Sequence, residues 1–262
     1  TMTEHRPVLI VTYPELLTLL WKLRQVSLPG LEPMPLPGWS AEEVSQLVAA
    51  ARDSLRKAGW LGSAGEVDPG AEELIEHCAA AGLVIRAICT TIRGAPRMFY
   101  FCVQGDRAVE HSLTVEGAHQ LRWLSGHEAL VERLLQIMAL PELDAPEGVP
   151  AELGMDGLRE AARLALSGDE AAAAATLAQS GAPTVMAEEL TRTLAGAEVN
   201  GSLTVERRGA DKTITGLAWV AGADMLWQVW PAQTNGARAR VSRSGTAAIV
   251  NWVSGVVTET AE

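Results

Sequence analysis

The chain has 262 residues, of which 48% are hydrophobic and 20% charged, as in an ordinary globular protein, so extensive disorder is not expected. Its formal net charge of −11 repels phosphate backbones and anionic headgroups, which disfavours nucleic acid and membrane surfaces as partners. No apolar run reaches the roughly 20 residues that span a bilayer, and the N-terminal residues lack a signal-peptide pattern. We therefore expect a cytoplasmic protein without membrane insertion.

The first half is predicted to begin with a strand at Val8–Val11. Thr12 to Glu15 has the pattern of a capping box, in which the two side chains satisfy each other's backbone N–H groups, and it opens a helix. A proline-rich segment, residues 29–38, leads to a second capped helix over residues 40–58. A third helix is predicted at residues 69–81. Alternating apolar residues and turn signals then predict an antiparallel meander with strands at 83–93, 97–104 and 107–114, and a fourth strand that ends at 125. A helix at 126–140 closes this half.

Residues 141–150 carry three prolines and several acids, and we interpret them as a linker. The second half repeats the plan of the first. Helices are predicted at 155–166, 169–179 and 183–194, with Ser167 and Glu170 as the capping box of the middle helix. Strands follow at 201–208, 212–221, 224–230 and 237–242, and a closing helix at 246–257.

The predicted fold class is therefore α+β, with two pseudo-symmetric halves that each contain helices, an antiparallel β meander and a closing helix. The halves are residues 1–140 and 151–262, joined by the linker 141–150 into one compact domain overall. An ancient duplication explains this repeat, and chance similarity of two α+β halves is the alternative.

No pattern in the chain has the form of a catalytic signature such as a nucleophile elbow, a P-loop or a zincin helix. His111 and His119 are eight residues apart and lack a convincing third ligand, so we expect structural or solvated roles for them. The three cysteines have no metal-ligand spacing and lie in apolar runs, where free thiols behave as small hydrophobes: Cys78, Cys89 and Cys102. We predict no catalytic residue, no metal and no cofactor, and hence a protein that is not an enzyme.

The aromatic content is unusual, because eight tryptophans stand against two tyrosines and two phenylalanines. In the second meander both faces of the strands are apolar, as the alternation of side chains around Trp219 and over residues 225–230 shows. Either these faces form a two-sided core, or one of them is a partly exposed patch for another protein. The residues that we predict to contact a partner are Trp219, Met225, Trp227 and Trp230.

The order of these elements resembles that of the EspG family, chaperones of type VII (ESX) secretion that bind PE–PPE heterodimers. The resemblance spans nearly the whole chain and is carried by element order. Its segments are Val8–Val11, Leu16–Leu23, Leu36-Pro37, Ser40–Ala58, Gly59-Trp60-Leu61, Glu72–Ala81 leading into Leu83–Arg93, and Leu226–Pro231 before a turn, a strand and a terminal helix.

The resemblance implies a central sheet with helical bundles, and a groove that covers the aggregation-prone helical tip of a PPE-like protein until export. A WXG100-like secretion substrate is a second class of client. The protein itself would be a monomer or a weak dimer.

Two other interpretations remain open at this stage. One is a generic interaction or regulatory module that dimerises through a sheet face. The other is an enzyme or small-ligand protein whose polar groups converge only in three dimensions, which predicts a deep pocket containing charged residues with shifted pKa values.

Overall fold

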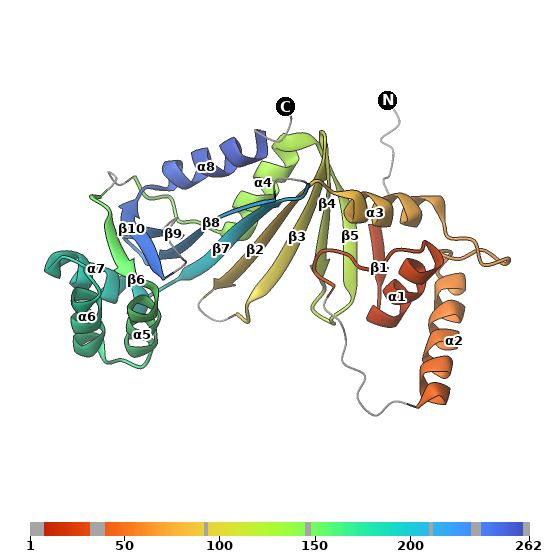
Figure 1. Cartoon of the computed structure of the whole chain (residues 1–262), viewed down its shortest axis with the longest axis horizontal. Coiled ribbons are helices and arrows are strands. Elements are labelled where there is room, and N and C mark those ends of the chain that lie inside the picture. The colour runs from red at the N-terminus through yellow and green to blue at the C-terminus, as the bar shows by residue number, and fades with distance from the viewer. Residues whose placement is uncertain are drawn as a thin grey trace. The chain divides into compact units, whose positions relative to one another are not determined.

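The computed structural model describes residues 8–31, 40–91, 94–144, 148–209, 212–231 and 237–258. Within these ranges the chain forms eight helices and ten strands (Figure 1). Their order is β1 (Val8–Val11), α1 (Tyr13–Lys22), α2 (Ala41–Lys57), α3 (Pro69–Ala80), β2 (Leu83–Thr91), β3 (Arg97–Gln104), β4 (Arg107–Leu113), β5 (His119–Ser125), α4 (Gly126–Met138), β6 (Ala151–Gly154), α5 (Met155–Leu166), α6 (Glu170–Gln179), α7 (Thr184–Ala195), β7 (Val199–Arg207), β8 (Thr213–Ala221), β9 (Leu226–Pro231), β10 (Arg238–Ser244) and α8 (Thr246–Thr258).

The predicted α+β class is confirmed. The strands belong to one sheet with the order β1-β5-β4-β3-β2-β7-β8-β9-β10-β6. Neighbouring strands pair in antiparallel fashion, as β1 does with β5 and β6 does with β10. The sequence prediction missed one element, the short strand β6 directly after the predicted linker, because its sequence Ala-Glu-Leu-Gly lacks the β-branched residues that mark β1, which is equally short. The predicted Leu36-Pro37 step lies outside the described residues.

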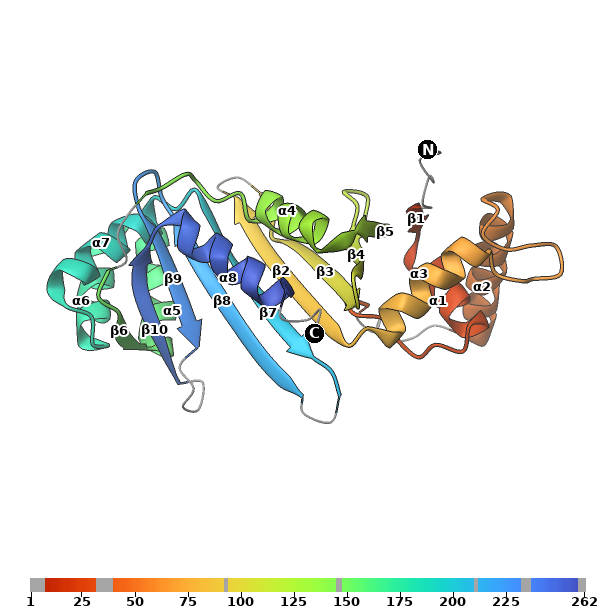
Figure 2. The same cartoon turned by 90° about the horizontal axis from the view of Figure 1, so that it is seen from above.

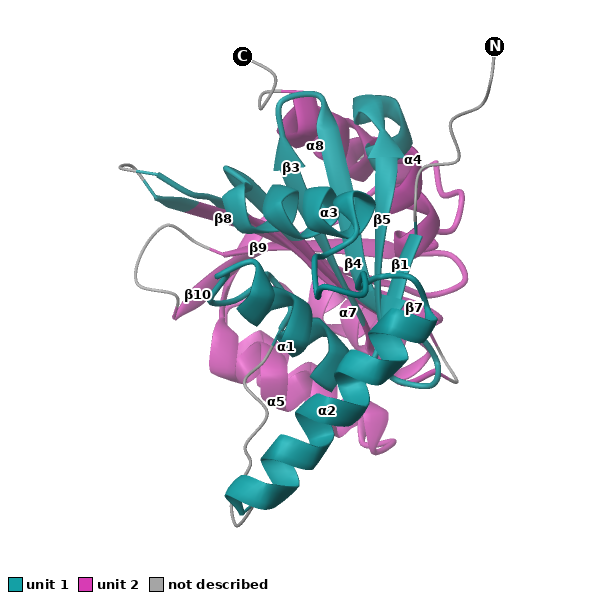
Figure 3. Cartoon of the chain, turned by 90° about the vertical axis from the view of Figure 1, so that its right-hand side faces the viewer, with its two compact units in different colours: residues 1–85, 98–130, 206–213 teal, residues 86–97, 131–205, 214–262 magenta. Residues whose placement is uncertain are grey.

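Two compact units can be distinguished in the chain, and Figure 3 colours them separately. The first comprises residues 1–85, 98–130 and 206–213, and the second comprises residues 86–97, 131–205 and 214–262. The predicted halves at 1–140 and 151–262, and their pseudo-symmetry, stay predictions.

The core of the first unit lies between one face of its strands and the helices α1 and α3. Leucines three and four positions apart give α1 a buried stripe, and the stripe of α3 follows the same spacing. Both helices pack these stripes on side chains that point to one face of β1, β4 and β5. These side chains are Leu9, Val11, Val109, Leu121 and Trp123. The first helix opens as predicted, because the Glu15 carboxylate accepts from the Thr12 backbone N–H at 2.6 Å.

In the second unit, α5, α6 and α7 form a small bundle that covers one face of β8, β9 and β10, while α8 crosses the other face (Figures 1 and 2). The bundle is rich in alanine, which lets its helices approach closely. Its shared core with the sheet includes Ala161, Ala173, Leu177, Leu190, Val220, Trp227 and Val241. Both faces of these strands are therefore covered over most of their length.

Candidate functional site

Trp227, one of the predicted contact residues, is buried between β9 and α7. It is 2% exposed, and its indole N–H donates to the Thr193 hydroxyl at 3.1 Å. The same hydroxyl donates to the backbone carbonyl of Glu189 at 3.0 Å. Because a buried N–H needs a partner, this chain of hydrogen bonds fixes the indole against the helix. The geometry gives Trp227 a structural position.

Trp219 is also 2% exposed, but on the opposite face of the sheet. It lies across from Gln228 in the β8–β9 register, and Gln228 alternates with Trp227 along the strand. Its ring covers Gly201 of β7, where an added Cβ would collide with the indole and with the Ile88 carbonyl. Gly201 is therefore required for this packing.

Met225 and Trp230 are half-buried and remain accessible. Met225 packs partly against the core of the α5–α7 bundle. Trp230 makes an edge-to-face contact with Trp252 of α8, with ring centroids 5.2 Å apart and an interplanar angle of 80°. The four predicted residues are thus divided between two faces of the sheet and do not form one patch. Their role in partner binding stays a prediction.

A set of half-buried apolar side chains lies on the bundle side of the second unit. Its members are half-buried and pack against the bundle core from α5 and β9: Met155, Leu158, Leu164, Met225 and Val229. We call this set the bundle surface. Ion pairs on the exposed side of α5, Arg159–Asp156 at 3.2 Å and Arg163–Glu160 at 2.5 Å, form a polar rim. Apolar area with a polar rim is the usual composition of a protein-binding surface.

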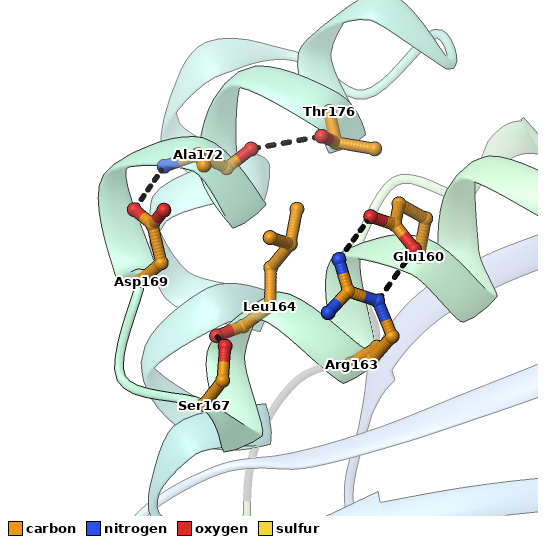
Figure 4. Close-up of polar contacts among 7 residues, drawn as sticks. All are labelled: Glu160, Arg163, Leu164, Ser167, Asp169, Ala172 and Thr176. Atoms are coloured by element: carbon orange, nitrogen blue, oxygen red, sulfur yellow. Dashed lines mark hydrogen bonds and ion pairs between the residues drawn. The ribbon is translucent and has the colours of Figure 1, made fainter.

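The turn between α5 and α6 is held by side-chain caps (Figure 4). The Asp169 carboxylate accepts from the Ala172 N–H at 3.1 Å, so Asp169 is the N-cap of α6. The predicted capping box of Ser167 and Glu170 is wrong: Ser167 ends α5, and its hydroxyl donates to the Leu164 carbonyl at 2.8 Å. Gly168, at a φ of +86°, makes the turn between the two helices and shifts the cap by two residues.

The first unit contains a cavity of about 340 Å³ on the α1 side of its sheet. His111 and His119 are almost fully buried in its floor, and Tyr13, Gly30 and Tyr100 are half-buried at its sides. Met98 and Leu113, which are 40% and 50% exposed, lie at its opening. Gly30 has a φ of +83°, and an added Cβ would collide with the Tyr100 ring. A glycine is therefore needed where this loop crosses the ring.

The two histidines form a directed chain of hydrogen bonds. His111 Nδ1 lies 2.6 Å from the Pro29 carbonyl oxygen, which can only accept, so this nitrogen carries a proton. His111 Nε2 must then accept in the neutral ring, and its partner at 2.9 Å, His119 Nδ1, donates. The remaining nitrogen, His119 Nε2, is left as an unprotonated acceptor.

The surroundings keep both rings neutral. Burial lowers the pKa of His111, and burial together with the neighbouring His111 lowers the pKa of His119 to about 4. The nearest buried carboxylate, Glu110, alternates to the other face of β4, where Arg122 donates to it at 2.7 and 3.1 Å. Structural or solvated roles were predicted for His111 and His119 from the sequence, but the hydrogen bond between them was not.

All three cysteines are free and buried, as predicted, and burial raises the pKa of Cys89 to about 12. The described ranges contain no group of three or more histidine, cysteine, aspartate or glutamate residues placed to hold a metal ion. In the same ranges, no helix is both long and apolar enough to cross a membrane.

The architecture is that of a mixed α/β protein with one antiparallel sheet and helices on both of its faces. The chain belongs to the EspG family, whose model matches residues 12–250. It is similar in structure to the Mycobacterium tuberculosis type VII secretion system chaperone EspG5, solved in complex with the PE25–PPE41 dimer. The two chains are 13% identical, align over 97% of this chain and 96% of that one, and superpose with a TM-score of 0.64. No curated protein matches the sequence.

Proposed function

We propose that this protein is a cytoplasmic chaperone that binds a PE–PPE-type heterodimer and keeps it soluble before export by a type VII system, and that it is not an enzyme. The observation that carries this proposal is membership of the EspG family over residues 12–250. The similarity to EspG5 over nearly the full length of both chains supports it, since that protein was solved with such a dimer bound. The mechanism is masking, in which apolar area on the client is covered until transfer.

The bundle surface is our candidate for client contact. Its residues offer apolar area on a rigid support, because the alanine-rich bundle is packed on the sheet beneath them. The ion pairs of α5 leave charged groups at the edge, where they orient a partner more than they strengthen its binding. Of the four residues predicted from sequence, only Met225 belongs to this surface. Trp230 lies on the opposite face of the sheet, so a substitution there tests whether the client binds that face instead.

Co-expression with a PE–PPE pair from the same genome tests the function. We expect the soluble fraction of the pair to rise in the presence of the protein, and the three chains to elute together in gel filtration. A pair that is equally insoluble with and without the protein, for every pair in that genome, would contradict the proposal.

Matched variants locate the surface. Leu158→Glu and Met225→Glu should reduce recovery of the pair by about tenfold, because each puts a charge into a desolvated contact. Val256→Glu is the control, since Val256 is a half-buried apolar residue of α8 on the other side of the sheet. Loss of binding with Trp230→Ala and with Val256→Glu, but not with the bundle variants, would move the client site to the α8 face.

A further inference from the structure

The cavity of the first unit has features of a ligand site that the chaperone activity does not require. Its floor holds a polar atom, His119 Nε2, on a side chain that is 5% exposed. The described residues offer this nitrogen no hydrogen-bond partner, whereas His119 Nδ1 is satisfied by His111. Solvent reaches this nitrogen, so a bound donor would replace the hydrogen bond that it otherwise makes with water.

The tautomer of His119 is fixed by a chain of two hydrogen bonds that begins at Pro29. The Pro29 carbonyl sets the proton on His111 Nδ1, and His111 Nε2 in turn sets the proton on His119 Nδ1. The free nitrogen is therefore an acceptor in every neutral state of the pair that keeps both hydrogen bonds. A ligand must donate to it.

The sides of the cavity restrict the ligand further. The Tyr13 ring centroid lies 5.8 Å from that of His119, and the Tyr100 centroid lies 6.3 Å from that of His111, so an aromatic ring lies beside each histidine. Met98 and Leu113 add apolar contacts at the opening. Among the described residues that line the cavity there is no aspartate, glutamate, lysine or arginine, so these residues offer a charged ligand no counter-ion for its lost hydration.

From this geometry we infer that the cavity binds a small, neutral aromatic molecule with one hydrogen-bond donor, held by His119 Nε2 between the rings of Tyr13 and Tyr100. A volume of about 340 Å³ is at the small end of the range for ligand pockets. This small volume favours a free small molecule, because a larger ligand would not fit.

Phenol and toluene form a matched pair of probes, since they share a ring and differ in the donor. Titration into protein labelled with ¹⁵N-histidine should shift the His119 Nε2 resonance with phenol. Toluene should bind about tenfold more weakly, because it leaves the acceptor unpaired. In His119→Phe the two probes should bind equally.

Leu113→Trp provides a second variant that leaves the floor intact. Leu113 is 50% exposed at the opening, so a larger side chain is tolerated there and should block both probes. Phenol that leaves the His119 resonance unchanged, or that binds equally well to wild type, His119→Phe and Leu113→Trp, would overturn the inference. His119→Phe should still solubilise the PE–PPE pair, which separates this site from the chaperone activity.

Discussion

At the scale of single residues, the structure shows partners of the tryptophans and histidines that their sequence context does not reveal. Trp219 and Trp227 resemble contact residues in the sequence, yet each has a specific structural partner: Gly201 for one and Thr193 for the other. The sequence indicates structural or solvated roles for His111 and His119, and the structure shows that they form a buried pair. In each case the decisive neighbour comes from a different strand or helix.

The Trp227–Thr193 hydrogen bond gives a prediction about stability. Thr193→Val removes the acceptor and leaves a buried indole N–H unpaired, which should lower the free energy of unfolding by about 1–3 kcal/mol. Thr193→Ser retains the hydroxyl and should lose much less. Urea denaturation of both variants measures the difference, and equal midpoints for the two would show that the bond contributes nothing.

The histidine pair makes stability depend on pH. The pKa of folded His119 is about 4, below the ordinary value of 6.5, so the unfolded chain binds protons that the folded chain excludes. Stability from this source is complete above about pH 6.5 and is lost as the pH falls toward 4. Stability should therefore fall between pH 7 and pH 5, because most of this interval lies between the folded and unfolded pKa values of His119. The lowered pKa of His111 acts in the same direction.

Urea unfolding at the two pH values tests this dependence. His119→Phe should show a smaller loss of stability between pH 7 and pH 5 than wild type. Thr193→Ser, which changes no titratable group, serves as the control and should show the same pH dependence as wild type. An unchanged pH dependence in His119→Phe would refute the assignment.

The register of the β4–β5 hairpin explains what could have been predicted about this pair. His111 lies opposite Leu121, and His119 lies opposite Leu113, so the two histidines are diagonal neighbours on one face. A register assigned from the turn at residues 114–118 would have placed them together. The contact with Pro29 could not be predicted, because it depends on a loop 82 residues away in the chain.

At the scale of elements, caps and alternation predict most boundaries. The Ser40–Glu43 capping box opens α2 as its sequence indicates, with the Glu43 carboxylate 2.7 Å from the Ser40 N–H. The start of α6 was predicted correctly to within one residue, although its cap was assigned to the wrong side chain. Ser167 and Asp169 both suit an N-cap, and only the turn at Gly168 decides between them.

This difference between two nearby side chains can be measured. Asp169→Ala removes the N-cap and should cost about 1 kcal/mol of unfolding free energy, because the alanine-rich helix α6 depends on its first turn. Ser167→Ala should cost less, since its hydroxyl only supplements the end of α5. A larger loss for Ser167→Ala, in thermal or urea unfolding, would contradict the cap assignment.

At the scale of the whole molecule, the described residues run twice through a series of one strand, three helices, four strands and one helix. Within each series the strand order is also the same, β1-β5-β4-β3-β2 and β6-β10-β9-β8-β7. The sequence predicted this repeated order apart from β6. It could not predict which apolar surface stays accessible, because alternation shows that both faces are apolar and not how far helices cover them.

The central claim is that this chain covers a PE–PPE-type client. Light scattering on the purified complex with a PE–PPE pair from the same genome tests it most directly. We expect the mass of the pair to increase by one copy of this 27.8 kDa chain, and the complex to dissociate with Leu158→Glu. Separate elution of this chain and every soluble pair, each at its own mass, would contradict the account.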